Sequence, residues 1–388
     1  MLPQTELLPE LGIIIAQMLI KTYPEDFCVK EVLDLERSGG PYSYYILKKR
    51  DTNLFHVLEV ISQRWKISRE RFGFCGIKDK RAITEQYLSI KEGPEKDLRT
   101  RNFELIFMGT GNRPLKIGDA QGNFFTVTLR GVDTKKVSEA FQIIGRIGFA
   151  NYFGIQRFTP DMHAKEPIAK LLLKGKFEEA LKEYFINHPD PQVRKKLKEG
   201  WENLPEVLED LHGLSKVDRI VLKRLSKKGS AEEALKAYPK AIKLLFFFSY
   251  QSLLWNRILC ELIKERGETF MVPLTRKERI AFYISLCPGI EKMMEFELPY
   301  ISEEVYSLPV SSIRKKIDKW IEKEGLRPDL NREVLGLKAF SSGRRKMIVL
   351  PRNMKVCEIH KDKITLQFFL PSGSYATIFL LKVINYPL

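Results

Sequence analysis

The chain has 388 residues, of which 44% are hydrophobic and 29% are charged, so it can form folded cores and is not a disordered protein. Its 65 Lys and Arg residues outnumber 49 Asp and Glu residues, and the net charge of +16 favours RNA or DNA as a partner. A Lys- and Glu-rich surface of the hyperthermophile type would give a similar charge, so charge alone does not decide the partner. The length indicates two domains.

Strands and a helix alternate at the start of the chain. Residues 20–32 predict two short strands around a Pro-initiated turn, and residues 42–47 predict a further strand. Asp51 and Thr52 are the expected N-caps of a helix through residues 56–61, where the apolar side chains share one face. The apolar run before residue 21 is too short for a membrane span and lacks a basic leader, so we expect a cytoplasmic protein.

A second strand and helix follow. Every second side chain of residues 123–130 is apolar, which is typical of a half-buried strand. Asp133 or Thr134 would then cap an amphipathic helix that ends near Gly148. This succession of strands and helices is α+β patterning.

The composition changes in the middle of the chain. Residues 159–245 are strongly charged and helical in pattern, and residues 273–335 form a mixed stretch with Pro and Gly breaks. Residues 363–370 restore the alternation of a strand. A Pro-Gly turn follows, and the residues after Ser374 are expected to open a helix whose first amides would face a phosphate or carboxylate. The shift predicts a second domain in the middle.

The five cysteines and five histidines give no pattern typical of a metal site or a disulfide framework. The cysteines are odd in number, lie far apart and include no CxxC pair, and the histidines form no HExxH motif. The sequence therefore predicts reduced thiols and no structural metal.

The strongest chemical signal is the segment GFCGIKDKRAITEQ, residues 73–86. Asp79 lies among Lys78, Lys80 and Arg81, and nearby cations favour the ionised form of a carboxylate. A tight turn at Gly76 would expose the Asp79 side chain to a large polyanionic substrate. A KDK segment by itself is more often a solvated loop, so the motif needs support from other segments.

Four separated segments combine polar side chains with Gly or Pro turns: PEDF at Pro24, GIKDKRAITEQ at Gly76, NYFGIQRF at Asn151 and LPSGSYAT at Leu370. In this order they resemble the TruD family of tRNA pseudouridine synthases, in an archaeal-type form. LKIGDAQGNFFTVTLR and SYQSLLWN extend the resemblance, which covers residues 21–376 and is looser in the middle third.

The resemblance implies an α+β fold: a pseudouridine synthase catalytic domain with a mixed, mainly antiparallel sheet, interrupted by a helix-rich insertion domain. The expected catalytic domain is 1–160 with 336–388, and the expected insertion is 161–335. The helix expected at 240–265 lies within the insertion interval, but it could pack on the catalytic domain, so its domain assignment is left open. The resemblance also implies tRNA as partner, with no cofactor, metal, membrane or obligate protein partner.

The resemblance assigns roles to single residues. Asp79 resembles the catalytic aspartate, and Lys21 resembles the basic residue that pairs with it. Phe153 resembles the residue that stacks on the flipped uracil, and Asn151 the polar residue beside it in the pocket. Three further cations are expected at phosphates: Lys80, Arg81 and Arg157. The competing interpretations are that Phe153 is only a core residue and that the cations are solvated.

One departure from the family pattern is visible after GIQRF. The chain continues with Thr159 and Pro160, where the family more commonly has Gly. This puts only the turn into the insertion in doubt.

The implied activity is the isomerisation of uridine to pseudouridine at position 13 in the D arm of tRNA. A carboxylate near the ribose could attack C1′ as a nucleophile or remove the C2′ proton, and both routes remain open. Two other functions are considered: an RNA-binding or chaperone protein with an idle Asp79, and a nuclease in which Glu25, Asp26 and Asp79 bind Mg²⁺.

Overall fold

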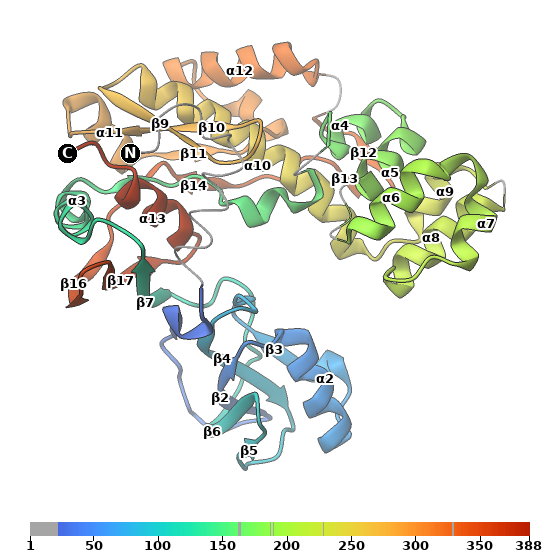
Figure 1. Cartoon of the computed structure of the whole chain (residues 1–388), viewed down its shortest axis with the longest axis horizontal. Helices are drawn as coiled ribbons and strands as arrows, with labels where there is room; N and C mark the ends of the chain where they lie inside the picture. The colour runs from blue at the N-terminus through green and yellow to red at the C-terminus, as the bar shows by residue number, and fades with distance from the viewer. Residues whose placement is uncertain (1–21, 162–163, 187, 189, 228, 328–329) are drawn as a thin grey trace. The chain divides into compact units, whose positions relative to one another are not determined.

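The computed structural model describes residues 22–388 apart from 162–163, 187, 189, 228 and 328–329. The chain forms two compact units (Figure 1). The first unit comprises the chain up to Asn151 together with Ile348–Leu388, and the second comprises Tyr152–Met347. The chain therefore leaves the first unit once and returns to it before the C-terminal strands.

One large sheet forms the frame of the first unit. Its strands are β1 (Phe27–Val32), β2 (Tyr42–Arg50), β3 (Phe72–Phe74), β4 (Ile83–Lys91), β5 (Leu98–Arg99), β6 (Phe103–Gly111), β7 (Gly122–Arg130), β16 (Arg352–Ile359) and β17 (Lys363–Pro371). The order is β16-β17-β7-β1-β4-β2-β6-β5, with β3 on β4. Among the strands described, β1 and β4 run parallel and the other neighbours run antiparallel. The predicted α+β fold with a mixed, mainly antiparallel sheet is confirmed.

Short elements complete the connections of the first unit. The predicted turn at the start of the chain is the 3₁₀ turn η1 (Pro24–Asp26), and the strand expected before it lies outside the described residues. A second 3₁₀ turn, η2 (Arg69–Arg71), precedes β3. The two-residue strands β8 (Phe149–Ala150) and β15 (Ile348–Val349) pair where the chain leaves and re-enters the unit.

Helices α2 (Leu54–Trp65), α3 (Thr134–Ile147) and α13 (Ala376–Ile384) belong to the first unit. The predicted capping by Asp133 is confirmed, because its side chain accepts hydrogen bonds from the amides of Lys135 and Lys136, and α3 ends before Gly148, whose φ is 75°. The expected caps of α2, Asp51 and Thr52, are wrong. Asn53 caps α2 by accepting from the Phe55 amide, while Asp51 has a left-handed φ of 46°.

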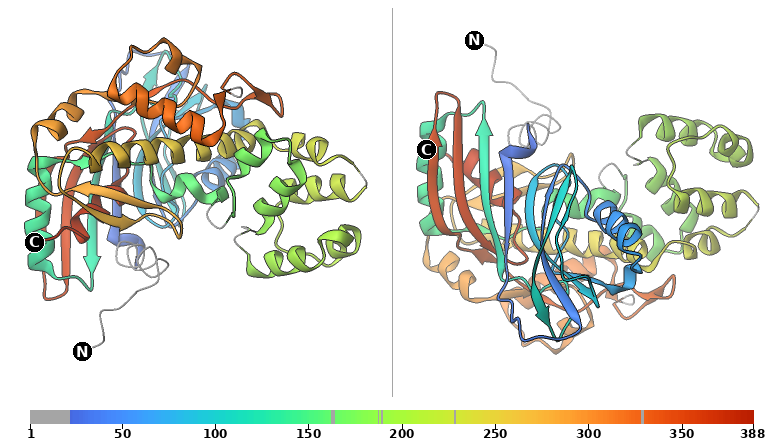
Figure 2. Two further views of the ribbon diagram at one scale, coloured as in Figure 1. Left: turned by 90° about the horizontal axis from the view of Figure 1, so that it is seen from above. Right: turned by 90° about the horizontal axis from the view of Figure 1, so that it is seen from below.

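Helices α2, α3 and α13 lie against the sheet of the first unit (Figure 2), and their side chains form two apolar clusters with it. In the first, α2 packs on β2, β4 and β6, with Leu58 and Ile61 of the helix in one cluster with Leu47, Leu88 and Leu105. In the second, α3 and α13 pack beside β7 and β17, and the Phe368 ring lies 5.4 Å from that of Phe125 and 4.6 Å from that of Phe379. In the strand order, β1 and β4 join the β2–β6 side of the sheet to its β7–β17 side.

The second unit is mainly helical. Its helices are α4 (Ile168–Leu173), α5 (Phe177–Ile186), α6 (Pro191–Glu199), α7 (Leu204–Glu209), α8 (Lys216–Ser226), α9 (Ala231–Lys236), α10 (Lys240–Lys264), α11 (Pro288–Glu295) and α12 (Ser312–Glu324). Its strands form short pairs: β9 (Thr269–Pro273) with β10 (Arg279–Tyr283), β11 (Glu297–Pro299) with β14 (Arg344–Lys346), and β12 (Glu333–Val334) with β13 (Leu337–Lys338). The 3₁₀ segments are η3 (Ile155–Asp161), η4 (Trp201–Asn203) and η5 (Glu303–Ser307).

Helix α10 is the central element of the second unit. It is 25 residues long and packs against η3, α4, β10 and α12. Its buried side chains include Tyr250, Trp255 and Asn256, so it is enclosed by its neighbours rather than amphipathic. Of the helices in the described part of the chain, none combines the length and apolar character needed to cross a bilayer.

Candidate active site

Asp79 lies in a loop that connects β3 to β4, residues 75–82, here called the Asp79 loop. The Asp79 side chain is half-buried, and Lys80 beside it is exposed. The expected tight turn at Gly76 is wrong: its φ is not positive, and an added Cβ would meet only the Lys78 ammonium at 3.6 Å. Glycine is required earlier, at Gly73, where a Cβ would lie 2.4 Å from the Leu115 carbonyl oxygen.

Side chains from two neighbouring strands hold the backbone of the Asp79 loop. Lys49 of β2 donates from Nζ to the Asp79 carbonyl oxygen at 2.7 Å and to the Thr52 carbonyl oxygen at 3.0 Å. Gln86 of β4 donates from Nε2 to the Gly76 carbonyl oxygen at 3.2 Å. Burial lowers the pKa of Lys49 to about 8, although the Asp79 charge acts in the opposite direction.

A third strand holds the loop through a buried ion pair. Glu31 of β1 has a fully buried side chain and accepts from the Lys78 ammonium, whose side chain is only 10% exposed. The other Glu31 oxygen accepts from the Tyr87 amide at 2.9 Å, which ties the carboxylate to β4. The residue immediately before Asp79 is therefore fixed by an oriented, charge-assisted contact.

These side chains share one face of the sheet. Lys49 pairs with Thr84, Thr84 with Val29, and Val29 with Phe125 of the second apolar cluster. Paired residues lie on the same face, and so do residues two positions along a strand. We call the set on this face the polar band; its members are Glu31, Lys49, Thr84 and Gln86. It separates the two apolar clusters and supports the Asp79 loop.

The second unit contains a cluster around Phe153. The Phe153 ring is 3% exposed, and the Arg345 guanidinium lies 4.2 Å from its centroid. Trp255 of α10 meets the ring edge to face at 5.5 Å. The Asn256 side chain holds the backbone: its Oδ1 accepts from the Phe153 amide at 2.8 Å, and its Nδ2 donates to the Phe153 carbonyl oxygen at 3.1 Å.

Comparison with known proteins gives the family. The family model "tRNA pseudouridine synthase D (TruD)" matches residues 15–275. The chain belongs to the TruD family. It is 37% identical to tRNA pseudouridine synthase D of Aquifex aeolicus, over 94% of this chain and 97% of that protein. It is 30% identical to "Probable tRNA pseudouridine synthase D 2" of Methanocaldococcus jannaschii, over 94% and 91% of the two chains.

The fold is also that of a solved structure. A Methanosarcina mazei protein that carries the TruD name superposes with a TM-score of 0.65, over 94% of this chain and 93% of that one, at 23% identity. The resemblance stated from the sequence is thereby confirmed, and the chain is a tRNA pseudouridine synthase of the isomerase class.

The residues predicted for the TruD site fall in different parts of the chain. Asp79, Lys80 and Arg81 share the Asp79 loop of the first unit. Asn151 is buried and follows β8, at the point where the chain leaves the first unit. Phe153 belongs to the second unit. Lys21 lies outside the described residues, so its predicted pairing with Asp79 stays a prediction.

Two of the three predicted phosphate-binding arginine and lysine side chains that the structure describes, Arg81 and Arg157, contact other groups of the chain. Arg81 donates to the Thr22 carbonyl oxygen at 3.1 Å. The Arg157 guanidinium lies over the rings of Phe153 and Phe248, at 5.3 and 5.4 Å from their centroids. Lys80 is exposed. The roles of these cations and the stacking role of Phe153 stay predictions.

The carboxylates considered for Mg²⁺ make other contacts. Asp26 is 2% exposed and binds Arg130 through both oxygens, at 2.8 and 3.0 Å. Glu25 pairs with Arg50 at 2.6 Å. Within the described ranges, three or more His, Cys, Asp or Glu side chains nowhere gather in a group that could hold a metal ion. The PEDF segment thus anchors β1 to β7.

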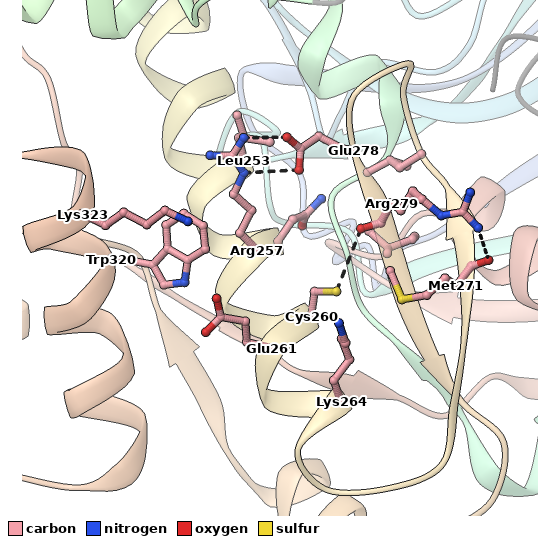
Figure 3. A pocket seen from close by; sticks show the side chains of 13 residues that line it. Leu253, Arg257, Cys260, Glu261, Lys264, Met271, Glu278, Arg279, Trp320 and Lys323 are labelled. Carbon is pink, nitrogen blue, oxygen red and sulfur yellow. Dashed lines mark hydrogen bonds and ion pairs between the residues drawn. The ribbon is translucent and has the colours of Figure 1, made fainter. Parts of the chain in front are cut away.

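A pocket of about 430 Å³ lies in the second unit between α10, the β9–β10 hairpin and α12 (Figure 3). Arg257 turns toward Glu278, with contacts of 2.6 and 3.2 Å, and the Lys323 ammonium lies 4.2 Å from the centroid of Trp320. Asn256 lines the pocket and also holds Phe153. None of the residues predicted for the site lines this pocket.

Sequence reasoning missed the polar band. The signal was present in the alternation of the strands: Lys49 falls on the same side of β2 as Leu47, and Gln86 on the same side of β4 as Leu88. Glu31 likewise shares a face of β1 with Val29. A charged or amide side chain at a core-facing position is unusual and marks a buried polar contact.

Proposed function

We propose that this TruD enzyme isomerises uridine 13 in the D arm of tRNA and that Asp79 is the reacting carboxylate. The observation that carries the proposal is the position of Asp79 on a loop held from three strands by buried side chains. Its motif, KDKRAITEQ, is one of the segments that carry the family resemblance. A fixed carboxylate suits a reaction in which the reacting groups must be oriented before bonds change.

The reaction requires one glycosidic bond to break and another to form. In the first route the Asp79 carboxylate attacks C1′, the C1′–N1 bond breaks, and uracil leaves with the electron pair on N1. The base turns, C5 attacks C1′ and displaces the carboxylate, C5 then loses its proton, and N1 gains one. In the second route Asp79 removes the C2′ proton while the C1′–N1 bond breaks, which gives a glycal and a uracil with the electron pair on N1. C5 then bonds to C1′ as the proton returns to C2′, C5 loses its proton, and N1 gains one. Substrate and product have the same composition, so neither route consumes a redox equivalent.

The remaining predicted residues would bind the substrate. We propose that Asn151 and Phe153 receive the flipped uridine, since a base must leave the helix before its glycosidic bond is accessible. The basic residues would hold phosphates: Lys21, Lys80, Arg81 and Arg157. We also propose that the first unit is the catalytic domain and that the helical second unit contains the insertion, expected at 161–335.

The test compares wild type with Asp79→Asn on an unmodified tRNA transcript, mapping pseudouridine by carbodiimide labelling and primer extension. We expect a stop at position 13 with wild type and none with Asp79→Asn, while both bind the tRNA. A stop at another uridine would refute the position but retain the activity. Binding without isomerisation by either protein would favour an RNA-binding role, and RNA cleaved only with Mg²⁺ would favour the nuclease.

A further inference from the structure

Lys49 is a buried cation that has no step in either of the two routes described for the isomerisation. It is 2% exposed and lies on β2 opposite Thr84, on the face that otherwise carries the apolar clusters. Withdrawing an ammonium group from water is costly, so such a lysine is retained where its donors have a specific use. Its ammonium group donates hydrogen bonds to the carbonyl oxygens of Thr52 and Asp79.

The contact with Asp79 fixes the residue that carries the reacting carboxylate. Thr52 follows the end of β2, so the ammonium joins the rigid sheet to the loop across 2.7 and 3.0 Å. Glu31 and Gln86 hold residues 78 and 76, whereas Lys49 contacts the peptide of residue 79 itself. Because the side chain leaves the same residue, rotation of that peptide changes the direction of the carboxylate.

We propose that Lys49 is a positioning residue for the isomerisation, acting through the peptide of Asp79; this rests on the proposed role of Asp79. Lys49 does not touch the substrate in this account. It keeps the carboxylate aimed at the ribose while the base leaves and returns. A displacement of about 1 Å in a reacting group can lower a rate by roughly 100-fold, so loss of this contact should affect the chemical step rather than RNA binding.

The decisive experiment is Lys49→Met, measured under single-turnover conditions on the tRNA transcript. Methionine is unbranched and apolar, so it can fill the buried site without a charge. We expect the rate constant to fall about 100-fold while the dissociation constant for tRNA changes less than about threefold. A wild-type rate in a folded Lys49→Met enzyme would overturn the proposal.

The matched control is Lys382→Met in the same unit. Lys382 of α13 is also a fully buried lysine, and its ammonium donates to the carbonyl oxygen of Gly148, the C-cap of α3, at 2.9 Å. It should keep the wild-type rate, because it removes the same kind of buried contact without touching the loop. A similar rate loss in both variants would mean that any buried lysine matters equally, and would also overturn the proposal.

Asp79→Asn and Lys49→Arg complete the comparison. If wild type forms no pseudouridine, the proposed function itself fails; if wild type is active, Asp79→Asn is inactive and Lys49→Met is fully active, only the Lys49 inference fails. Should Lys49→Met not fold, Lys49→Arg replaces it. Its planar guanidinium retains charge but places its donors elsewhere, so we expect a loss of about 10-fold or more with tRNA affinity unchanged. A wild-type rate in Lys49→Arg would refute the positioning role.

Discussion

Replacing Glu31 by Gln tests whether the buried ion pair with Lys78 is a coupled unit. The Glu31 side chain is fully buried and that of Lys78 is 10% exposed, so the change leaves the ammonium without its countercharge away from water. Removing one partner of such a pair costs about 3–5 kcal/mol of unfolding free energy. Because Gln can still accept from the Tyr87 amide, we expect the lower end, about 3 kcal/mol.

The double-mutant cycle supplies the magnitude of the coupling. Lys78→Met should destabilise by a similar amount, because it leaves the Glu31 carboxylate uncompensated. Combining Glu31→Gln with Lys78→Met removes both charges, so the double variant should recover about 2 kcal/mol or more relative to the sum of the single changes. Unfolding free energies from urea titration at pH 7, with a common m-value, give each corner of the cycle.

A surface pair in the same sheet is the matched control. The Nζ atom of Lys48 in β2 lies 3.9 Å from Oε2 of Glu85 in β4, and the two side chains are 48% and 26% exposed. Their cycle should give a coupling below about 1 kcal/mol. Additive effects at Glu31 and Lys78 would refute the reasoning, because they would mean that water or nearby groups compensate each charge separately.

Further predictions follow from other buried groups and from the charge of the chain. Burial raises the pKa of Asp161 to about 6, so the folded state holds a proton that the unfolded state has lost. Relative to Asp161→Asn, wild type should therefore lose about 3 kcal/mol of stability as pH rises from 3 to 7, which urea titration of both proteins at each pH will show. The pKa of Lys49 is lowered instead, so between pH 8 and 10.5 the unfolded state binds more protons and wild type should gain about 3 kcal/mol relative to Lys49→Met. A difference in unfolding free energy between wild type and variant that does not change with pH would contradict either prediction. Asn256→Leu removes the side chain that bonds the buried amide and carbonyl of Phe153. We expect the free energy of unfolding to fall by about 3 kcal/mol and the thermal midpoint to fall with it. An unchanged midpoint would show that other groups replace the Asn256 side chain. Affinity for tRNA should fall steeply in a salt titration, whereas a flat titration would exclude phosphate contacts as the main source of binding.

The sequence predicted the elements whose signals are local. The alternation in residues 123–130 became β7, and Asp133 became the cap of α3, because a strand period and an N-cap are each set by neighbours along the chain. The cap of α2 was placed too early because three polar residues precede the helix, and only the backbone geometry selects Asn53.

The support of the site could not be predicted in the same way. Strand β1 pairs with β4, which lies more than fifty residues further along, so the approach of Glu31 to Lys78 depends on sheet pairing rather than on local pattern. Asn256 likewise reaches Phe153 across 103 residues. The motif resemblance predicted Asp79 as the catalytic residue, but a motif does not show which buried groups contact the loop that carries it.

The energetics of the polar band indicate why the sheet retains it. A buried ion pair often adds little net stability compared with apolar residues of similar volume, so Glu31 and Lys78 are not explained by folding alone. Burying the Lys49 ammonium costs about 3 kcal/mol at pH 7, and its hydrogen bonds to two carbonyl groups, at about 1.5 kcal/mol each, roughly offset this. Apolar side chains here would join the two clusters into one continuous core.

Such a continuous core would lack the side-chain contacts that Gln86, Glu31 and Lys49 make with residues 76, 78 and 79. The stability of the first unit and the orientation of Asp79 are therefore separable properties, maintained by different side chains on one face of the sheet. Apolar replacement of Lys49, or of Glu31 and Lys78 together, should leave stability near that of wild type while it lowers the rate of isomerisation. We infer that the chain keeps charged groups where a core would favour apolar ones because these groups hold the Asp79 loop in one orientation.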